Sequence, residues 1–139
     1  MKLFVDSSAF IALADAADQD HKAATGFYRG CPPETQFHTS NYILAETVTR
    51  LRRTAGHHVA IRWVKMTLES RLTVRHYVEE TTERVALQIF ERYHDQPLSF
   101  VDCTTIALLR QLDLDRIFSF DRDFQRLGYT LVPGLALGT

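Results

Sequence analysis

The sequence is poor in cysteine. It holds 2 cysteines among 139 residues, Cys31 and Cys103, and no Cys-x-x-Cys spacing. Two isolated cysteines cannot build the disulfide framework of a small secreted domain, and they lack the spacing of a zinc or thiol redox site. These two classes are therefore excluded, and we expect a protein of a reducing compartment, the cytoplasm.

Long hydrophobic runs are also absent. No window approaches the roughly 18 to 20 apolar residues that a membrane-spanning helix requires. Near the N-terminus, Asp6 interrupts the apolar stretch of residues 3–5 too early for the core of a signal peptide. We therefore expect neither a membrane span nor an export signal.

Glycine and proline are scarce, with 6 and 4 residues, and no repeat, low-complexity tract or linker-like run interrupts the chain. Collagen-like and disordered chains are excluded, because 45% of the residues are hydrophobic and 11% are aromatic, enough for a buried core. A chain of this length fits one compact unit. We expect a single domain over residues 1–139.

The chain as a whole has little excess charge of either sign, but one segment has a strong excess of positive charge. The formal net charge is −1, which argues against a protein that binds nucleic acid through bulk charge alone. Residues 41–76 nevertheless contain seven basic and two acidic residues, a net charge of +5. The basic residues are Arg50, Arg52, Arg53, Arg62, Lys65, Arg71 and Arg75.

Hydrophobic periodicity alternates between short strands and longer helices. Strands are predicted over residues 2–6, 36–39, 72–74, 116–120 and 130–132. Helices are predicted from residue 7 or 8 to about 18, and over 20–29, 41–55, 59–69, 82–93 and 99–112. This alternation favours a three-layer α/β/α fold with a mostly parallel sheet of four to five strands.

Four acidic residues occupy positions that such a fold can bring together. Asp6 follows the first strand, and Asp121 follows the strand that ends at residue 120. Ligands of open α/β sheets bind beyond the carboxyl ends of the strands, so both carboxylates are expected at one functional edge. Asp102 lies in the first turn of its helix and can be aimed at the same edge. Glu46 lies midway along the 41–55 helix, away from its predicted apolar stripe.

Each acid also has an ordinary structural interpretation. Asp102 and Ser99 form the Ser-x-x-Asp pattern of a helix capping box. Asp6 can cap the first helix, Asp121 can close a turn, and Glu46 can be a surface charge. For each acid taken singly, these interpretations stay open.

Taken together, four converging carboxylates require a counter-charge. At an effective dielectric constant of about 20, two such charges about 4 Å apart repel by about 4 kcal/mol. Hard divalent cations such as Mg²⁺ and Mn²⁺ prefer oxygen ligands, and the cluster contains no histidine or cysteine. The four acids therefore predict a divalent-metal site.

The segments around these acids resemble the PIN-domain family, especially the VapC-like toxins of toxin–antitoxin pairs. The resemblance covers nearly the whole chain, in the order and spacing of four motifs. The matching segments are residues 4–10 (FVDSSAF), Ala45-Glu46, residues 97–102 (PLSFVD) and residues 119–124 (SFDRDF).

The resemblance implies the toxin of a VapBC-type pair, an Mg²⁺- or Mn²⁺-dependent endoribonuclease that hydrolyses RNA phosphodiester bonds. Its catalytic acids would be Asp6, Glu46, Asp102 and Asp121. Asp6, Asp102 and Asp121 would hold the metal, and Glu46 would bind a second ion or orient the attacking water. Supporting hydrogen bonds are expected from Ser7, Ser8, Thr105, Ser119 and, less centrally, Asp123.

The resemblance also implies partners: an RNA substrate, a cognate antitoxin protein and a second copy of the chain in a homodimer. Arg50 and Arg53 continue the helix of Glu46 and are expected to bind RNA phosphates. Arg62, Lys65 and Arg75 would extend that basic track.

Two alternatives stay open. A domain of this fold can bind RNA or a protein without cleaving anything, and the same metal site can attack DNA. A phosphatase of the haloacid-dehalogenase type is less suitable, because it needs a second acid two positions after the first, where this chain has Ser8.

Overall fold

The computed structural model of the chain describes residues 1–134. Its five strands are β1 (Lys2–Val5), β2 (Gln36–Ser40), β3 (Thr73–His76), β4 (Arg116–Phe118) and β5 (Thr130–Val132). Its helices are α1 (Ser7–Ala14), α2 (His21–Gly30), α3 (Asn41–Thr54), α4 (His57–Glu69), α5 (Glu80–Arg92), α6 (Phe100–Leu112) and α7 (Asp123–Arg126). None of these helices combines the length and hydropathy needed to cross a membrane.

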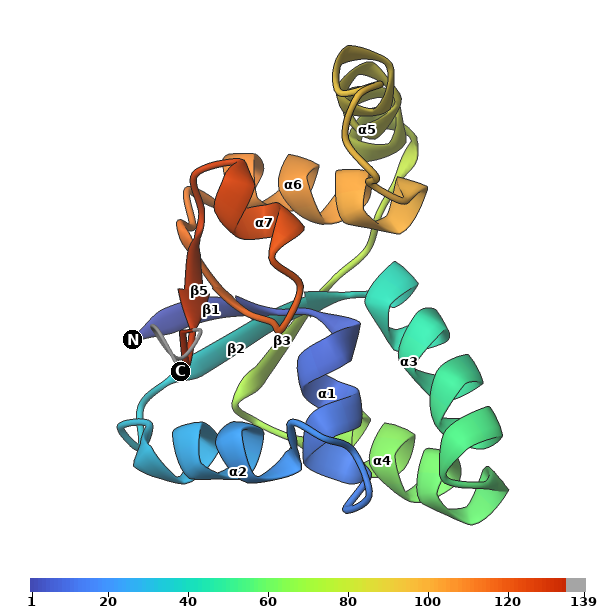
Figure 1. Cartoon of the computed structure of the whole chain (residues 1–139), viewed down its shortest axis with the longest axis vertical. Coiled ribbons are helices and arrows are strands. Elements are labelled where there is room, and N and C mark those ends of the chain that lie inside the picture. The colour runs from blue at the N-terminus through green and yellow to red at the C-terminus, as the bar shows by residue number, and fades with distance from the viewer. Residues whose placement is uncertain (135–139) are drawn as a thin grey trace.

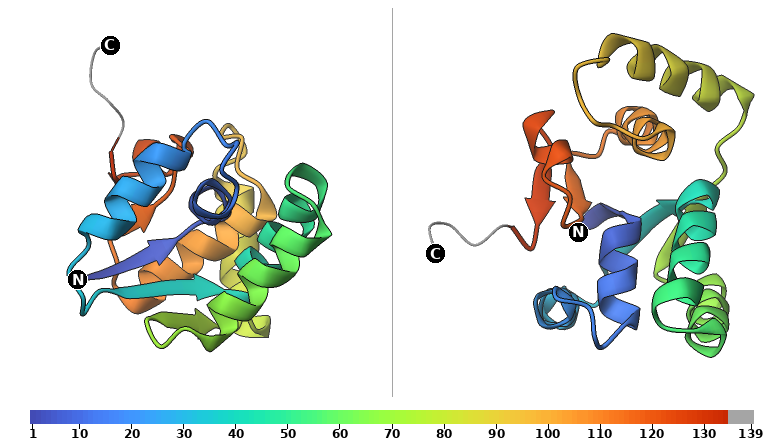
Figure 2. Two further views of the ribbon diagram at one scale, coloured as in Figure 1. Left: turned by 90° about the horizontal axis from the view of Figure 1, so that it is seen from below. Right: turned by 45° about the vertical axis from the view of Figure 1, so that its right-hand side comes forward.

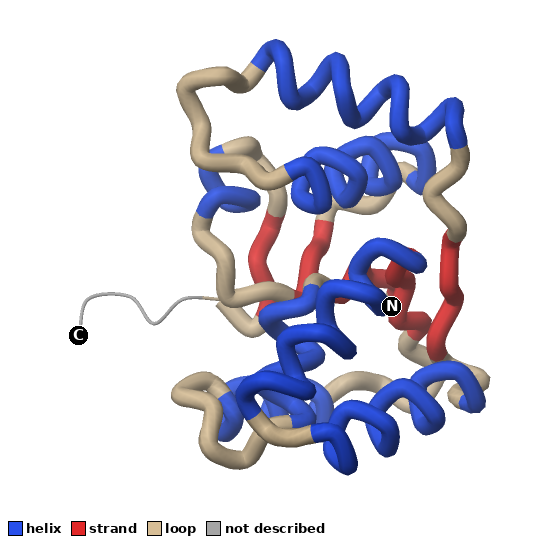
Figure 3. The backbone as a smooth tube through the Cα atoms, turned by 90° about the vertical axis from the view of Figure 1, so that its right-hand side faces the viewer, coloured by secondary structure: helices blue, strands red, loops and turns tan. Residues whose placement is uncertain are grey.

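The strands form one parallel sheet in the order β3-β2-β1-β4-β5. Helices α1 to α4 lie toward one side of the sheet and α5 to α7 toward the other (Figures 1 and 3). Helix α5 stacks on the outer side of α6, farther from the strands (Figure 2). The predicted three-layer α/β/α fold with a mostly parallel sheet is therefore confirmed.

The order of the strands creates a switch point beside β1. The chain first moves from β1 to β2 and β3, and then returns to the other side of β1 to form β4 and β5. Val5 is paired with Phe118 in the register of β1 and β4, and the Asp6 N–H donates to the Phe118 carbonyl at 3.0 Å. Open parallel sheets bind their ligands at such switch points.

The hydrophobic core explains why the central elements form where they do. Central strands of a parallel sheet are covered on both faces, and their residues are accordingly apolar in runs rather than alternating. Leu3, Phe4, Ile117 and Phe118 are completely buried. Helix α6 is buried on nearly every side, with residues 103–109 all below a tenth exposed. The site-bearing ends of β1 and β4 therefore rest on the most rigid part of the fold.

Two predicted elements were too long at functionally important places. Helix α1 ends at Ala14 rather than near residue 18, because Asp15 adopts an extended backbone. Strand β4 ends at Phe118 rather than at residue 120, because the Ser119 hydroxyl accepts the Asp121 N–H and turns the chain. Both corrections lengthen loops at the carboxyl edge of the sheet.

Helix α4 begins earlier than predicted. His57 and His58 precede the predicted helix of residues 59–69 but form the first residues of α4. Gly56 has a φ of 98°, a conformation that favours glycine, so the chain reverses there in a single residue. Every other boundary agrees with the prediction to within two residues.

We expect Leu109→Ala to lower the free energy of unfolding by about 2–5 kcal/mol, because it leaves a cavity in the core that α6 forms. Leu109 is completely buried, whereas Leu87 on α5 is 52% exposed. Leu87→Ala is the matched control, and chemical denaturation of the two variants measures the difference. Equal losses of stability would contradict this placement of the core.

Candidate active site

A pocket of about 490 Å³ opens at the carboxyl ends of β1 and β4. All four acids singled out in the sequence line it, although they come from four different parts of the chain. The lining residues are Asp6, Ser7, Ser8, Ile11, Asp18, Gln19, Asp20, Glu46, Arg50, Ser99, Asp102, Phe120, Asp121 and Arg122.

Asp6 lies at the base of this pocket, between the end of β1 and the start of α1. It is the N-cap residue of α1, but its side chain makes no capping hydrogen bond, so the capping interpretation is wrong for its carboxylate. Instead, the hydroxyls of Ser8 and Ser119 donate to Oδ2 at 3.0 and 2.9 Å. Burial raises the pKa of Asp6, and these two donors act against that rise by stabilising the charged form.

The same two hydroxyls position Asp121. Ser8 Oγ accepts the Phe120 N–H and Ser119 Oγ accepts the Asp121 N–H, each at 3.0 Å. These bonds attach the loop after β4 to the first turn of α1. Asp121 Oδ1 in turn accepts the Asp123 N–H at 2.9 Å, so the turn predicted for Asp121 forms as well.

Glu46 reaches the pocket because α3 packs on a different face from the predicted one. Ser40 caps the helix by accepting the Ile43 N–H at 3.1 Å. The sequence predicts an apolar stripe of Leu44, Val48, Leu51 and Ala55. The buried residues are Ile43, Thr47 and Leu51, so only Leu51 is shared and the first two lie one position earlier than predicted. Since Glu46 lies one turn after Ile43, it is beside the buried face and not opposite it.

Contacts with α1 hold Glu46 in place. The Ser7 hydroxyl donates to Glu46 Oε1. Arg50 Nη1 lies 3.4 Å from Ser7 Oγ and 3.9 Å from Glu46 Oε1. The carboxylate is thus oriented by one neutral and one positive group before any ligand arrives.

Asp102 has both a structural role and a place in the pocket. Its N–H donates to Ser99 Oγ at 3.0 Å, and its Oδ2 accepts the Ser99 N–H at 2.9 Å, which completes the predicted capping box. Burial raises the pKa of Asp102 to about 6, and the negative charges of Asp6 and Asp121 add to the rise. Asp102 is therefore repelled by both of these carboxylates.

The donor set fits a hard divalent cation. Every charged donor near the centre of the pocket is a carboxylate oxygen, and the repulsion felt by Asp102 is what a bound cation would relieve. Within residues 1–134, however, no three acidic, histidine or cysteine side chains form a ready-made metal site. Asp6, Asp102 and Asp121 are each held by hydroxyl or backbone donors.

The predicted supporting residues separate into two groups. Ser7, Ser8 and Ser119 contact the acids directly. Asp123 is absent from the pocket lining: its backbone contacts Asp121, while its carboxylate pairs with Arg126 at 3.0 Å. The Thr105 hydroxyl is buried and has no hydrogen-bond partner within the described part of the chain.

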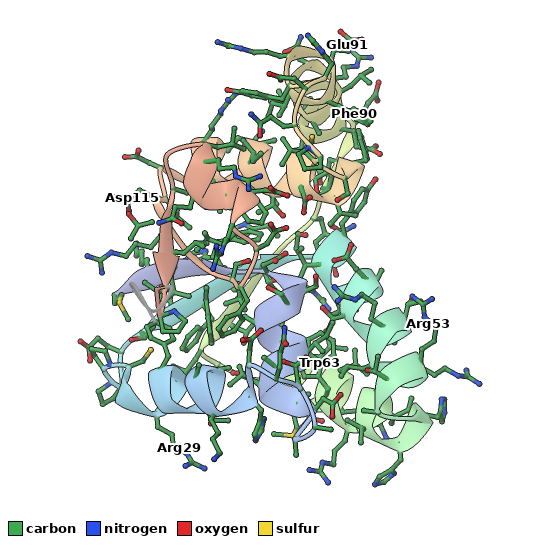
Figure 4. The ribbon with its side chains drawn as sticks, viewed as in Figure 1. Arg29, Arg53, Trp63, Phe90, Glu91 and Asp115 are labelled. Atoms are coloured by element: carbon green, nitrogen blue, oxygen red, sulfur yellow. The ribbon has the colours of Figure 1, made fainter. Side chains whose placement is uncertain are left out.

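The predicted RNA-binding arginines line a continuous depression along α3. A second pocket of about 490 Å³ shares Glu46 and Arg50 with the first and continues to Arg53. Figure 4 shows Arg53 projecting from α3 at the edge of the molecule. Arg62 lines a separate, apolar pocket and Arg75 donates to the Tyr77 hydroxyl. The extension of the track through Arg62, Lys65 and Arg75 stays a prediction.

Several pocket residues were not predicted. Asp18, Gln19 and Asp20 lie in the loop between α1 and α2, and Arg122 directly follows Asp121. The signal for the loop was the polar stretch after Ala14, which has no apolar residue at helical spacing larger than alanine. Arg122 gave no signal of its own, because its neighbours in sequence do not reveal which way a loop residue faces.

This fold and acidic pocket define a PIN domain. The family model of the PIN domain matches residues 3–128, and the chain therefore belongs to the PIN domain family. The single domain over residues 1–139 stays a prediction, and its last five residues lie outside the described part of the chain.

The chain is similar to a VapC protein both in sequence and in structure. The chain is 33% identical over 130 residues to the 23S rRNA-specific endonuclease VapC20 of Mycobacterium tuberculosis, covering 94% of this chain and 97% of that protein. The crystal structure of that VapC20, described as a Sarcin-Ricin loop cleaving toxin, matches with a TM-score of 0.86 at 32% identity, covering 92% and 96% of the two chains.

More distant structures share the fold alone. A toxin–antitoxin complex from Klebsiella pneumoniae matches with a TM-score of 0.69 at 13% identity, covering 96% of this chain and 99% of the other. FitAcB from Neisseria gonorrhoeae matches with a TM-score of 0.68, also at 13% identity, covering 94% and 96%.

The raised pKa of Asp102 predicts a pH dependence of stability. Because burial raises the pKa of its carboxyl from the ordinary value of 3.8 to about 6 in the folded state, ionisation disfavours the folded state. In chelator-treated protein, we expect the unfolding free energy to fall as the pH rises from about 4 to 6. The loss attributable to Asp102 should be on the order of 1 kcal/mol, because water partly screens this group.

Asp102→Asn is the control, since asparagine can still accept the Ser99 N–H but does not ionise. Denaturation curves of the two proteins across this pH range measure the difference, which contains the titration of Asp102 together with its coupling to Asp6 and Asp121. Curves that stay parallel from pH 4 to 7 would show that the Asp102 carboxyl is not perturbed.

Proposed function

We propose that this protein is a VapC-type endoribonuclease that hydrolyses phosphodiester bonds of RNA. One observation carries the proposal: four acids from distant parts of the chain line a single pocket at the sheet switch point, in a chain 33% identical to a named endonuclease over 94% of its length. Ribosomal RNA is the first substrate class to test, because the similar protein is named for 23S rRNA.

Hydrolysis of a phosphodiester bond requires an attacking water and stabilisation of the charge that develops on the phosphoryl oxygens. Nucleases of the PIN family generally use a divalent metal, and the oxygen donors favour Mg²⁺ or Mn²⁺ here. Asp6, Asp102 and Asp121 would hold the ion. Once bound, it would neutralise developing charge and promote ionisation of water.

Glu46 is the group best placed to orient the attacking water. Glu46 lines the same pocket as Asp6, but it comes from α3, whereas Asp6 follows β1. The Ser7 hydroxyl donates to Oε1, and Arg50 Nη1 lies 3.9 Å from the same oxygen. Glu46 thus remains an acceptor for a water proton, while Ser7 limits the rotation of the carboxylate.

The proposed function includes RNA and protein partners. Arg50 and Arg53 form a cationic border along α3 that suits RNA phosphates leading toward the acids. Matches to chains from toxin–antitoxin complexes support an antitoxin protein as a second partner. A homodimer belongs to the same proposal, together with a cytoplasmic location.

A binding module without catalysis is the competing function. The complete set of four acids around one pocket favours the enzyme, because a purely cationic surface would bind RNA without placing repelling carboxylates beside its phosphates. Metal-dependent cleavage of RNA, stopped by EDTA, separates the two functions, and competition with DNA tests the other alternative.

We expect Asp6→Asn to reduce cleavage of ribosomal RNA by at least about 100-fold, because it removes the central negative charge of a metal-dependent site. Asp115→Asn is the matched control: Asp115 precedes β4 at the opposite end of the strand and lies far from α3 in Figure 4. Cleavage is followed on denaturing gels with Mg²⁺ or Mn²⁺ and with EDTA. Near-native cleavage by folded Asp6→Asn protein at saturating metal would reject the assignment.

Two neighbouring arginines on α3 test the substrate track. Arg53 lines the second pocket, whereas Arg52 lines neither pocket of the site. We expect Arg53→Ala to raise KM for RNA by about 3- to 10-fold, typical of one lost phosphate contact, and Arg52→Ala to have a smaller effect. Equal changes in KM for the two variants, measured at one salt concentration, would place the RNA elsewhere.

A further inference from the structure

The walls of the acidic pocket differ in charge. Beside its four central acids, the pocket has two arginines in its lining, Arg50 and Arg122. They lie on opposite sides of the central strand, because α3 follows β2 while the loop carrying Arg122 follows β4. The wall formed by the α1–α2 loop is acidic, since it contributes Asp18 and Asp20.

This distribution limits the path of a polyanion across the pocket. Phosphates are attracted to the two arginine walls and repelled by the acidic loop between α1 and α2. Burial and the charge of Asp18 raise the pKa of Asp20, which is consistent with two carboxylates held near each other in that loop. An RNA strand that enters along α3 therefore leaves most favourably over the loop after β4.

Arg122 is placed and available for this contact. It is exposed, and it makes no ion pair within residues 1–134, whereas the nearby Arg126 is engaged with Asp123. Its backbone position is set by the hydrogen bonds that Ser8 and Ser119 make to the two preceding residues. The base of the side chain is thus fixed relative to Asp6, while the guanidinium keeps its donors for a ligand.

We infer that Arg122 is a substrate-positioning residue that binds a phosphate of the RNA strand on the far side of the acids from Arg50. The bond to be cleaved then lies between two cationic contacts, one on each side of the central strand. The inference rests on the proposed ribonuclease function and adds to it a direction for the bound strand.

The test compares Arg122→Gln with Arg122→Lys and a matched control, Arg116→Gln. Arg116 is also exposed and begins β4, at the end of the strand opposite the pocket, so the control removes the same charge. Binding is measured on the Asp6→Asn background in EDTA, with a fluorescent single-stranded RNA and anisotropy as the readout. Thermal melting confirms that each variant is folded.

We expect Arg122→Gln to weaken binding by about 3- to 10-fold at moderate salt. The slope of log affinity against log salt should decrease by about 0.7, the value for one phosphate contact with a single strand. Arg122→Lys should keep most of the slope, because it keeps the charge. In proteins that retain Asp6, Arg122→Gln should raise KM more than it lowers kcat.

Three results would overturn the inference or the function on which it rests. If Arg122→Gln and Arg116→Gln have equal affinities and equal salt slopes, Arg122 does not position RNA, and the proposed function is unaffected. If Arg122→Lys has lost as much of the slope as Arg122→Gln, the contact is not one of charge, and the inference also fails. If the unaltered protein neither cleaves nor binds RNA, the ribonuclease proposal itself fails.

Discussion

The organisation of the pocket depends on one buried carboxylate and the hydroxyls that hold it. Asp6 lies at the end of the central strand and is only 4% exposed. Its two hydroxyl donors, Ser8 and Ser119, are 111 residues apart in the chain. Burial of a charge without such donors is costly, so the folded state is favoured only when both ends of the chain have come together. Because the same hydroxyls accept backbone N–H groups of the loop after β4, the bonds that stabilise Asp6 also place Asp121.

The acids that line the pocket also take part in the hydrogen bonds that hold the fold together. Asp102 completes the capping box of α6 and also lines the pocket, and Glu46 links α3 to α1 through Ser7. Burial raises the pKa of Asp102, the charges of Asp6 and Asp121 add to the rise, and the hydrogen bonds with Ser99 act against it. The bonds that cap α6 therefore also favour the charged form of a carboxylate that lines the pocket.

Much of the fold was predictable because it depends on local periodicity. The buried strands, the long helices and the Ser40 cap are encoded in short stretches of sequence, and the acids after β1 and β4 followed from the rule for parallel sheets. Predictions failed where a distant partner decides the local structure. Strand β4 is shorter than predicted because the Ser119 hydroxyl donates to Asp6 and accepts the Asp121 N–H. Helix α3 buries Ile43 and Thr47, which the sequence did not predict, where it packs against its neighbours.

The sequence by itself determined the class of fold, the number and order of the acids, and the oxygen-only character of their ligand set, since these are properties of residue type and spacing along one chain. Only the tertiary structure decided which loop residues reach the pocket. Asp18, Asp20 and Arg122 have no helical or strand periodicity that would show their direction. The charge of each wall is set by contacts between segments far apart in the chain, and such contacts leave no trace in the spacing of neighbouring residues.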